Sequence, residues 1–403
     1  MFGTTKVFTA AALGILLGVG ACHNDELIRP AVPASGALFQ HYVSFGNSIT
    51  AGIQSGGLND SLQRLAYPVL LASAMGTTFY YPGLNNPGCP PPITNIFTNP
   101  PTRLLGLSSA FCALRSSPIP PYLHNVAFPG ADVLELLNTN YGQPQPPASA
   151  TDAYKLFLLG GRTELQRARE AQPTFVTVWV GNNDVFGAIL DTGDAGKASD
   201  VTLPATFSQR FQALMDSIDS FGTVQGGVAI GVVQVTGAPY VSTGRAYSAA
   251  SIPNLTVNAN CLAGDHIPGA PLSDSAFVLV PFHYGALLIR ASASVPTTLD
   301  CSDPHVISVA EAINMITSVA LYNLTIKQAA AARNWVYIDP NVLLKALAAV
   351  PGAILPFPNP NSQTAPFGTA VSRDGVNPST STQRLLAQVF KDSINVHYSV
   401  AIP

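Results

Sequence analysis

Short apolar segments alternate with helical stretches along most of this chain, and this alternation constrains the fold more than any other feature. The segments that we expect to form strands are 42–45, 125–128, 174–180, 227–235 and 335–338. Helical patterns lie between or after them, at 67–75, 309–332 and 380–397. Such an order is typical of β-α-β units, in which helices cover both faces of a parallel sheet. The sequence therefore predicts an α/β fold.

Local signals support the helices. Thr163 with Gln166, and Ser308 with Glu311, have the spacing of a capping box. Helical periodicity predicts one core-facing stripe in 309–332 and another in 380–397. The residues expected to face the core are Ile313, Ile316, Ala320 and Leu324 in the first helix, and Leu386, Val389, Phe390 and Ile394 in the second.

The composition excludes two classes of protein. Charged residues make up 10% of the 403 residues, hydrophobic residues make up 47%, and the formal net charge is −3. A chain with this much apolar surface is not kept disordered by its charge. Lys and Arg together number 19, so no basic stripe is evident that would release counterions from phosphates. We expect no nucleic acid among its partners.

The first residues resemble a bacterial export signal. Lys6 precedes a largely apolar run of a length that suits a signal-peptide core rather than a membrane span. The segment 17–22, Leu-Gly-Val-Gly-Ala-Cys, resembles a lipobox, which implies cleavage after residue 21 and lipidation of Cys22. His23 favours the outer membrane in that interpretation. An ordinary signal peptide with a chance cysteine is the alternative. No later stretch predicts a transmembrane helix.

The remaining chain divides into a tether, 22–38, and one domain, 39–403. The domain contains two long insertions, 81–122 and 237–303, which are rich in proline or contain cysteines. Loops of this length are mostly functional or disordered. We expect these two to form ordered walls over a site at the strand ends.

Cysteines support an exported chain. Once Cys22 is set aside, the other four allow two disulfides in three possible pairings. We favour Cys89–Cys112 and Cys261–Cys301, because each pair brackets one loop-rich segment. Free buried thiols are the alternative. No cysteine or histidine spacing predicts a metal site, and Asp191, Asp194 and Asp200 miss the spacing of a calcium loop.

Ser48 stands just after the first predicted strand, in Phe45-Gly46-Asn47-Ser48. In an open parallel sheet, ligands bind outside the carboxyl ends of the strands. A serine at that edge, where a helix begins, has an exposed hydroxyl and a backbone N–H aimed at an incoming anion. These are the properties of an acyl-transfer nucleophile. The same pattern also fits an ordinary strand-to-helix turn.

Two further segments follow predicted strands. Gly130 lies in Phe128-Pro129-Gly130-Ala131, where its backbone can approach a ligand closely. Asn183 lies in Gly181-Asn182-Asn183-Asp184, where its side-chain amide can donate to an oxyanion. Each segment alone also fits a structural turn.

Together with Asp374-Gly375-Val376 near the C-terminus, these blocks resemble the SGNH (GDSL-type) hydrolase family, over residues 41 to 398. The resemblance implies a three-layer αβα sandwich like that of flavodoxin, with about five parallel strands. It also implies that Ser48 is the nucleophile, and that the N–H groups of Ser48 and Gly130 and the amide of Asn183 form the oxyanion hole.

The last block departs from the family pattern. That pattern is Asp-x-x-His, but here Asp374 is followed at the histidine position by Asn377. The histidine takes the serine proton and returns it to the leaving group. Asn has no basic nitrogen near neutral pH, so Asn377 cannot do this. Asp374 would then orient a base that is missing.

Another histidine could substitute, and His283 and His266, in or beside the second insertion, are the best candidates. His41 and His124 lie at strand starts, at the wrong edge of the sheet, and His397 ends the last helix.

The leading hypothesis is a lipid-anchored, monomeric serine ester hydrolase without a cofactor. Its substrate would be a small-molecule or lipid ester, preferably an acyl or aryl ester rather than a highly charged one. The alternative is a catalytically inactive relative that binds a lipid, ester or glycan at the cell surface.

Overall fold

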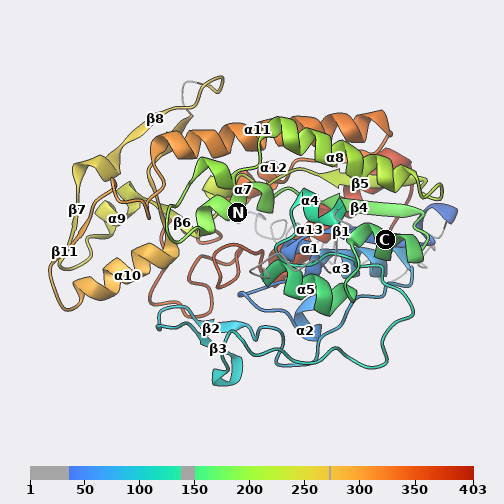
Figure 1. Cartoon of the computed structure of the whole chain (residues 1–403), viewed down its shortest axis with the longest axis horizontal. Helices are drawn as coiled ribbons and strands as arrows, with labels where there is room; N and C mark the ends of the chain where they lie inside the picture. The colour runs from blue at the N-terminus through green and yellow to red at the C-terminus, as the bar shows by residue number, and fades with distance from the viewer. Residues whose placement is uncertain (1–35, 138–149, 272–273) are drawn as a thin grey trace, which may run out of the picture.

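The computed structural model describes residues 36–137, 150–271 and 274–403. The predicted signal peptide 1–21, Cys22 and most of the tether 22–38 lie outside these residues. The core is a parallel sheet in the order β1-β4-β5-β12 (Figure 1). Its strands are β1 (Tyr42–Gly46), β4 (Phe175–Trp179), β5 (Gly226–Ile230) and β12 (Val336–Ile338). The predicted α/β class is confirmed.

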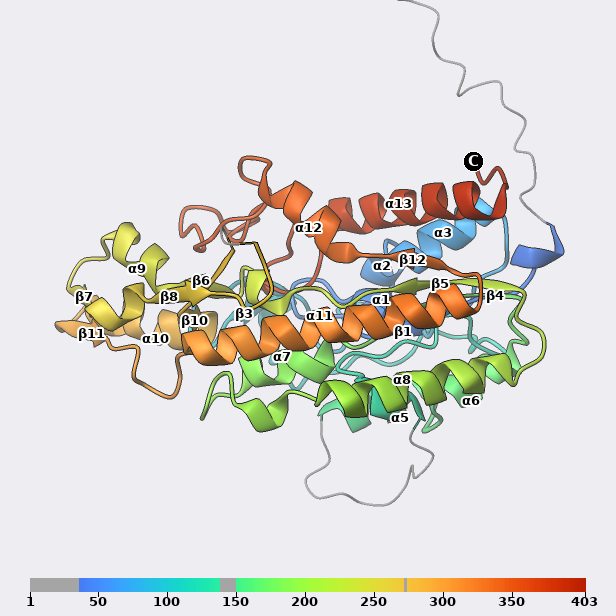
Figure 2. The ribbon, with the colours of Figure 1, turned by 90° about the horizontal axis from the view of Figure 1, so that it is seen from above.

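Helices cover both faces of the sheet, because alternate strand residues are apolar on both sides (Figure 2). Tyr42 and Phe175 pack on one face, with α3 and α13. Val43 and Val176 pack on the other, with α7, α8 and α11. The predicted three layers are therefore present. The bounds of these helices are α3 Tyr67–Met75, α7 Asn183–Leu190, α8 Pro204–Asp219, α11 Val309–Ala332 and α13 Thr380–Tyr398.

The fifth predicted strand, 125–128, does not form a full strand. This segment lies beside β1, but it makes only an isolated parallel bridge between Ser44 and Asn125. The N–H of Ala127 donates to the side chain of Asn125 at 3.2 Å, so it is not available to a ladder. The sheet therefore has four strands, and the segment at 125 continues it by one bridge.

The helix α11 is rotated from the predicted orientation. Its buried residues are Ala312, Met315, Ser318, Val319, Tyr322, Ile326, Ala329 and Ala330. Ala320 and Leu324, which were expected in the core, are exposed. By length and composition α11 could also span a membrane. However, it packs along α8, where the rings of Tyr322 and Phe207 stack with centroids 4.0 Å apart.

Other local predictions are confirmed. Both capping boxes form, at Thr163 and at Ser308. In α13 the predicted residues Leu386, Phe390 and Ile394 are buried, and Val389 is half-buried.

The shorter elements of the domain are α1 Ser48–Ala51, α2 Asp60–Gln63, α4 Val133–Leu137, α5 Ala150–Leu159, α6 Glu164–Glu170 and α12 Pro340–Ala348.

The two insertions carry the predicted disulfides, Cys89–Cys112 and Cys261–Cys301. The first insertion contains β2 (Ile93–Asn95) and β3 (Thr102–Arg103). The second forms a small unit at one end of the molecule (Figure 1), with its own core around Tyr247, Cys261 and Val280. Its elements are β6 Val241–Thr243, α9 Gly244–Ala250, β7 Leu255–Val257, β8 Gly264–His266, β9 Ser275–Phe277, β10 Leu279–Pro281, α10 Phe282–Ser292 and β11 Thr297–Leu299.

Candidate active site

Ser48 is placed by β1 and by the cap of α1. The side chain of Asn47 accepts the N–H of Ile49 at 3.2 Å, so the chain turns into the helix directly after the buried strand. Ser48 is half-buried, and its hydroxyl makes no hydrogen bond with any residue that the structure describes. As the first residue of α1 it also has an N–H with no partner inside the helix. Ser48 thus offers an unengaged hydroxyl and an unengaged amide.

Gly130 lies at the same edge of the sheet, at the end of the segment next to β1. The bridge at Asn125 places this segment beside β1, and the Asn125 amide donates to the Thr50 carbonyl of α1 at 2.8 Å. Gly130 is exposed and has φ +84°, a conformation that favours glycine. Within the described part of the chain, its N–H donates no hydrogen bond. It is a second free backbone donor at this edge.

Asn183 begins α7, after β4, and its side chain reaches back to the Gly130 loop. Its Nδ2 donates to the Ala131 carbonyl at 2.8 Å, which leaves the second N–H of the amide free. The segment at 125, β1 and β4 are neighbours and run parallel. Ser48, Gly130 and Asn183 therefore follow the carboxyl ends of three adjacent segments, as the sequence predicts.

Asp184 fixes the same loop from the other side. Its Oδ2 accepts the Val133 N–H at 3.0 Å. Burial, and then the neighbouring carboxylate of Asp132, raise the pKa of Asp184 to about 7. Two consecutive residues of α7 thus hold the loop that carries Gly130. The sequence offered Asp184 only as part of the third block, without a role.

A second buried acid, Glu164 of α6, supports the turn before Ser48. Its Oε2 accepts the Gly46 N–H at 2.9 Å, and its side chain is fully buried. Burial raises the pKa of Glu164 well above its usual range, whereas the N–H groups of Gly46 and Phe128 and the ammonium of Lys155 oppose this shift. No sequence signal identified Glu164, because its partner Gly46 lies 118 positions away.

The loop 372–378 carries the predicted acid and the asparagine at the base position. One carboxylate, that of Asp374, accepts five hydrogen bonds. The donors are Gly56 N at 2.7 Å, Asn377 N at 2.8 Å, Val376 N at 2.9 Å, Ser372 Oγ at 3.0 Å and Asn377 Nδ2 at 3.0 Å. Asp374 therefore organises a tight turn, and it holds Asn377, the residue at the position where the sequence motif predicts a histidine.

The orientation of the Asn377 amide follows from these bonds. An ionised carboxylate only accepts, so the nitrogen of Asn377 must face Asp374 and its oxygen must face away. That oxygen, Oδ1, is buried and has no hydrogen-bond partner among the described residues. Where a histidine would present a basic nitrogen, the chain presents an unpaired and non-basic oxygen.

The same loop is fastened to the segment that follows Ser48. Ser372 Oγ accepts the Ser55 N–H at 2.8 Å, and Gln383 in α13, the helix that follows the loop, donates through Nε2 to the Ile49 carbonyl at 3.0 Å. Through these bonds the structure brings Asp374 and Asn377 to the serine side of the sheet edge, although more than 300 positions separate them in sequence.

No histidine ring within the described residues is hydrogen-bonded to Ser48. The rings have other partners: His124 accepts the Tyr80 N–H, His266 contacts the Asp274 carbonyl, His305 pairs with Asp303, and His397 contacts the Asn334 carbonyl. His283 pairs with the Tyr240 hydroxyl at 3.1 Å, and its Nε2 is buried without a partner. His283, one of the two proposed substitutes, lines a cavity that also reaches Asp374.

The described residues contain no group of three or more His, Cys, Asp or Glu that could hold a metal ion. In the acidic loop, Asp191 instead accepts the N–H groups of Gly193 and Asp194, as in a local turn.

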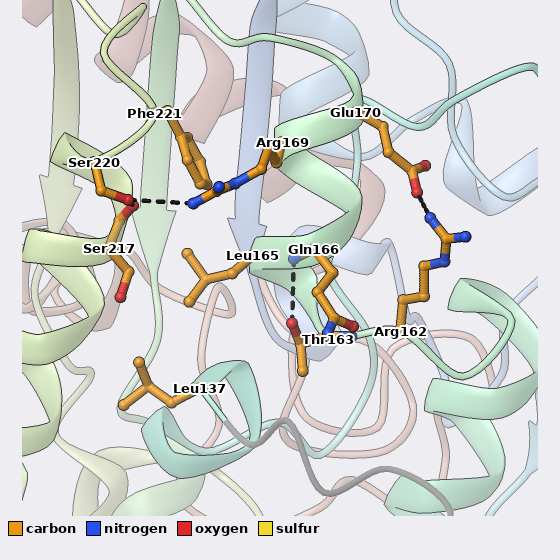
Figure 3. A pocket seen from close by; sticks show the side chains of 10 residues that line it. All are labelled: Leu137, Arg162, Thr163, Leu165, Gln166, Arg169, Glu170, Ser217, Ser220 and Phe221. Atoms are coloured by element: carbon orange, nitrogen blue, oxygen red, sulfur yellow. Dashed lines mark hydrogen bonds and ion pairs between the residues drawn. The ribbon is translucent and has the colours of Figure 1, made fainter.

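One surface depression, of about 650 Å³, lies away from this site (Figure 3). Its walls include the end of α6 and the end of α8, which lead into the amino ends of β4 and β5. The opposite edge of the sheet carries Ser48. Arg162 pairs with Glu170, and Arg169 donates to Ser220, so these arginines are already engaged.

Comparisons with known proteins give similarity of structure alone. No family model and no curated protein matches the chain. Similar solved structures include the acetylxylan esterase Axe2 of Geobacillus stearothermophilus, at 12% identity and TM-score 0.38, over 88% of this chain and 93% of that one. A candidate GDSL-like lipase from Parabacteroides merdae is 9% identical at TM-score 0.38, over 89% of this chain and 96% of that one.

Proposed function

We propose that this chain is a serine ester hydrolase of the SGNH type that works without a histidine base. The observation that carries the proposal is the unengaged hydroxyl of Ser48, placed beside the free donors of Gly130 and Asn183 at one sheet edge. A preorganised set of donors of this kind stabilises a developing oxyanion, which is commonly the largest single contribution to acyl transfer.

In the proposed reaction, Ser48 Oγ forms a bond to the carbonyl carbon of the ester. The carbonyl oxygen takes the negative charge and is held by the N–H groups of Ser48 and Gly130 and by Asn183 Nδ2. The serine proton goes to water, because Asn377 cannot accept it. The alcohol leaves with a proton from water, and a second water then releases the acid from the acyl-serine.

This mechanism predicts a slow enzyme. Loss of the base from a serine triad costs roughly 10⁴–10⁶ in rate, while the oxyanion hole and binding retain about 10³–10⁴ over the reaction in water. We expect turnover in that residual range for simple aryl esters.

The decisive experiment follows acylation of the chain by 4-nitrophenyl acetate. We expect intact-mass analysis to find one acetyl group on the native chain, located on Ser48, and slow release of 4-nitrophenol. Ser48→Ala should remove both signals. Ser61→Ala, at an exposed serine in the short helix α2, is the matched control and should retain them. Equal rates for the native chain and Ser48→Ala would refute the proposal.

One observation favours a second candidate function, a binding protein that no longer catalyses. Asn377 is held by Asp374 in the position of the base, 6% exposed, with its oxygen unpaired. An amide there cannot accept the serine proton, so a ligand held by the free donors at the sheet edge would stay unchanged. Saturable binding of an ester without acylation of Ser48 would support this candidate.

We also propose that the chain is exported and lipid-anchored through Cys22 in the outer membrane, and that it is a monomer. The lipobox-like segment 17–22 supports the anchor, and two disulfides agree with export. In a bacterial host, Cys22→Ala should move the protein from the membrane fraction to the soluble fraction. Retention in the membrane would contradict the anchor.

A further inference from the structure

A cavity of about 380 Å³ opens beside Asp374, between the two insertions. One wall is the first insertion, with Ile93 and Ile96, and the other is α10 of the second insertion, with Phe282 and Leu287. The cavity is thus mainly apolar, and its size suits one aromatic ring or a short acyl chain with its substituents. We call it the Arg290 cavity.

The Arg290 cavity adjoins both halves of the candidate site. Asp374 lines it directly. Tyr240 lines it as well, donates its N–H to the Gly375 carbonyl at 2.9 Å, and places its ring 6.2 Å from that of Phe186 in α7, the helix that begins at Asn183. A group bound in this cavity would therefore lie against the walls of the catalytic edge.

Two arginines give the cavity its charge. Arg290 and Arg373 line it, both are half-buried, and neither forms a salt bridge within the described part of the chain. Arg373 donates through Nε to the Gln363 carbonyl at 2.7 Å, whereas Arg290 makes no hydrogen bond with the described residues. The only carboxylate in the lining is Asp374, and its two oxygens already accept five hydrogen bonds.

Two guanidinium groups against one carboxylate leave the lining of this apolar cavity with a net positive charge, which selects for a particular chemistry. Guanidinium is planar and matches a carboxylate with paired N–H donors. Hydrogen bonds to charged groups are stronger than those between neutral groups. The apolar walls favour an aryl or alkyl body, and the arginines favour an anion attached to it.

We propose that the Arg290 cavity is a substrate subsite for an apolar group that carries a carboxylate, bound by Arg290 and Arg373. As a substrate subsite it rests on the proposed function, because it assigns the cavity to the ester that Ser48 would attack. The proposed subsite also refines the expected substrate. The preferred ester has an apolar body, as the sequence suggests, but it carries one acidic group.

The test compares two esters that differ in one charge, 4-acetoxybenzoate and its neutral methyl ester. Binding is measured by calorimetry on the Ser48→Ala chain, so that turnover plays no part. We expect 4-acetoxybenzoate to bind at least tenfold more tightly than the methyl ester, and we expect this preference to weaken as salt is added.

Variants test whether the tighter binding of 4-acetoxybenzoate depends on the Arg290 cavity. Arg290→Gln removes a charge without removing any hydrogen bond of the described structure, so it should fold and should lose about tenfold or more of the preference. Arg373→Gln should do the same, and Arg290→Lys should recover part of it. Arg384→Gln, at an exposed arginine of α13, is the matched control and should retain the full preference.

The outcomes separate this proposal from the proposed function. Equal binding of the two esters, or a preference that survives in both Arg290→Gln and Arg373→Gln, would overturn the subsite. The calorimetry could show a charge preference that depends on both arginines while Ser48 of the native chain is never acylated. That result would support the cavity as a binding site and refute the esterase instead.

Discussion

The two halves of the candidate site differ in how their polar groups are engaged. On the side of Ser48, Gly130 and Asn183, donors are left free toward the open edge of the sheet. On the other side, Asp374 accepts five hydrogen bonds and holds Asn377 in place. The donors of the first half are free to bind a ligand, whereas the carboxylate of the second half already has its hydrogen-bond partners within the protein.

This difference indicates what the site has kept and what it has lost. Free donors gathered at one sheet edge can hold an anion or a developing oxyanion, and water can take their hydrogen bonds until one binds. A carboxylate saturated by its own loop has a structural role whether or not a base is present. In the proposed function, the half with Ser48, Gly130 and Asn183 accounts for the chemistry, and the Asp374 half accounts for the geometry of the loop.

The largest effect is expected for Asn183→Ala, which removes a free donor from the half of the site that carries Ser48. Removing one oxyanion donor should lower kcat by about 10²–10³. The neighbouring variant Asn182→Ala serves as the control, because that side chain accepts the Val233 N–H and faces the structure rather than the proposed ligand. Steady-state rates on 4-nitrophenyl acetate measure the effect. An equal loss in both variants would show that Asn183 acts only through packing.

Asp374→Ala should affect stability more than catalysis. It removes the acceptor of four different residues and leaves buried donors unpaired, which should lower the free energy of unfolding by about 2–4 kcal/mol. With no histidine to orient, the rate of Ser48 acylation should change less than tenfold. Urea unfolding and acylation rates test the two parts. A hundredfold or larger loss of rate, without loss of stability, would show that Asp374 participates in the chemistry.

The smallest expected effect concerns the pH dependence of stability. The folded chain holds a proton on Asp184 up to a pKa of about 7, above the ordinary value of 3.8, because burial disfavours the charged form. Between these values the folded state binds more protons than the unfolded state. This group therefore lowers stability as pH rises through that window, by at most about 1.4 kcal/mol per pH unit.

Asp184→Asn does not titrate and should remove this decline. We expect the variant to gain stability relative to the native chain between pH 5 and pH 8 in urea unfolding. Asp265→Asn, at an exposed position of β8, should follow the native chain. An identical pH profile for the native chain and Asp184→Asn would contradict the buried, protonated state of Asp184.

Much of the fold was predictable, because apolar runs and caps act locally. The strands at 42, 174 and 335, the helix Tyr67–Met75 and both capping boxes follow from nearby residues. We predicted a full strand at 125–128, but the segment forms only one bridge. The side chain of Asn125 accepts the Ala127 N–H, which a strand pairing would otherwise use. The face of α11 was misassigned because the helix is apolar almost all round, so that periodicity alone could not select the side that packs on α8.

The site was predictable only where a motif marks it. Ser48, Gly130, Asn183 and the loop of Asp374 and Asn377 lie at one edge, as expected from the four blocks. Glu164 and the cavity around Arg290 were not predictable, because they depend on contacts between segments far apart in the sequence. Pairings of this kind are set by tertiary packing and leave no local pattern.

The activity of Asn377→His shows whether the site lacks only its general base. A histidine there can donate to Asp374 through Nδ1 and present Nε2 to Ser48 as a general base. If the site lacks only its base, kcat/KM on 4-nitrophenyl acetate should rise by about 10²–10⁴ over the native chain, and the double variant with Ser48→Ala should be inactive. If Asn377→His folds and its activity does not rise, then the half of the site that carries Ser48 is not an intact catalytic apparatus and the account is wrong.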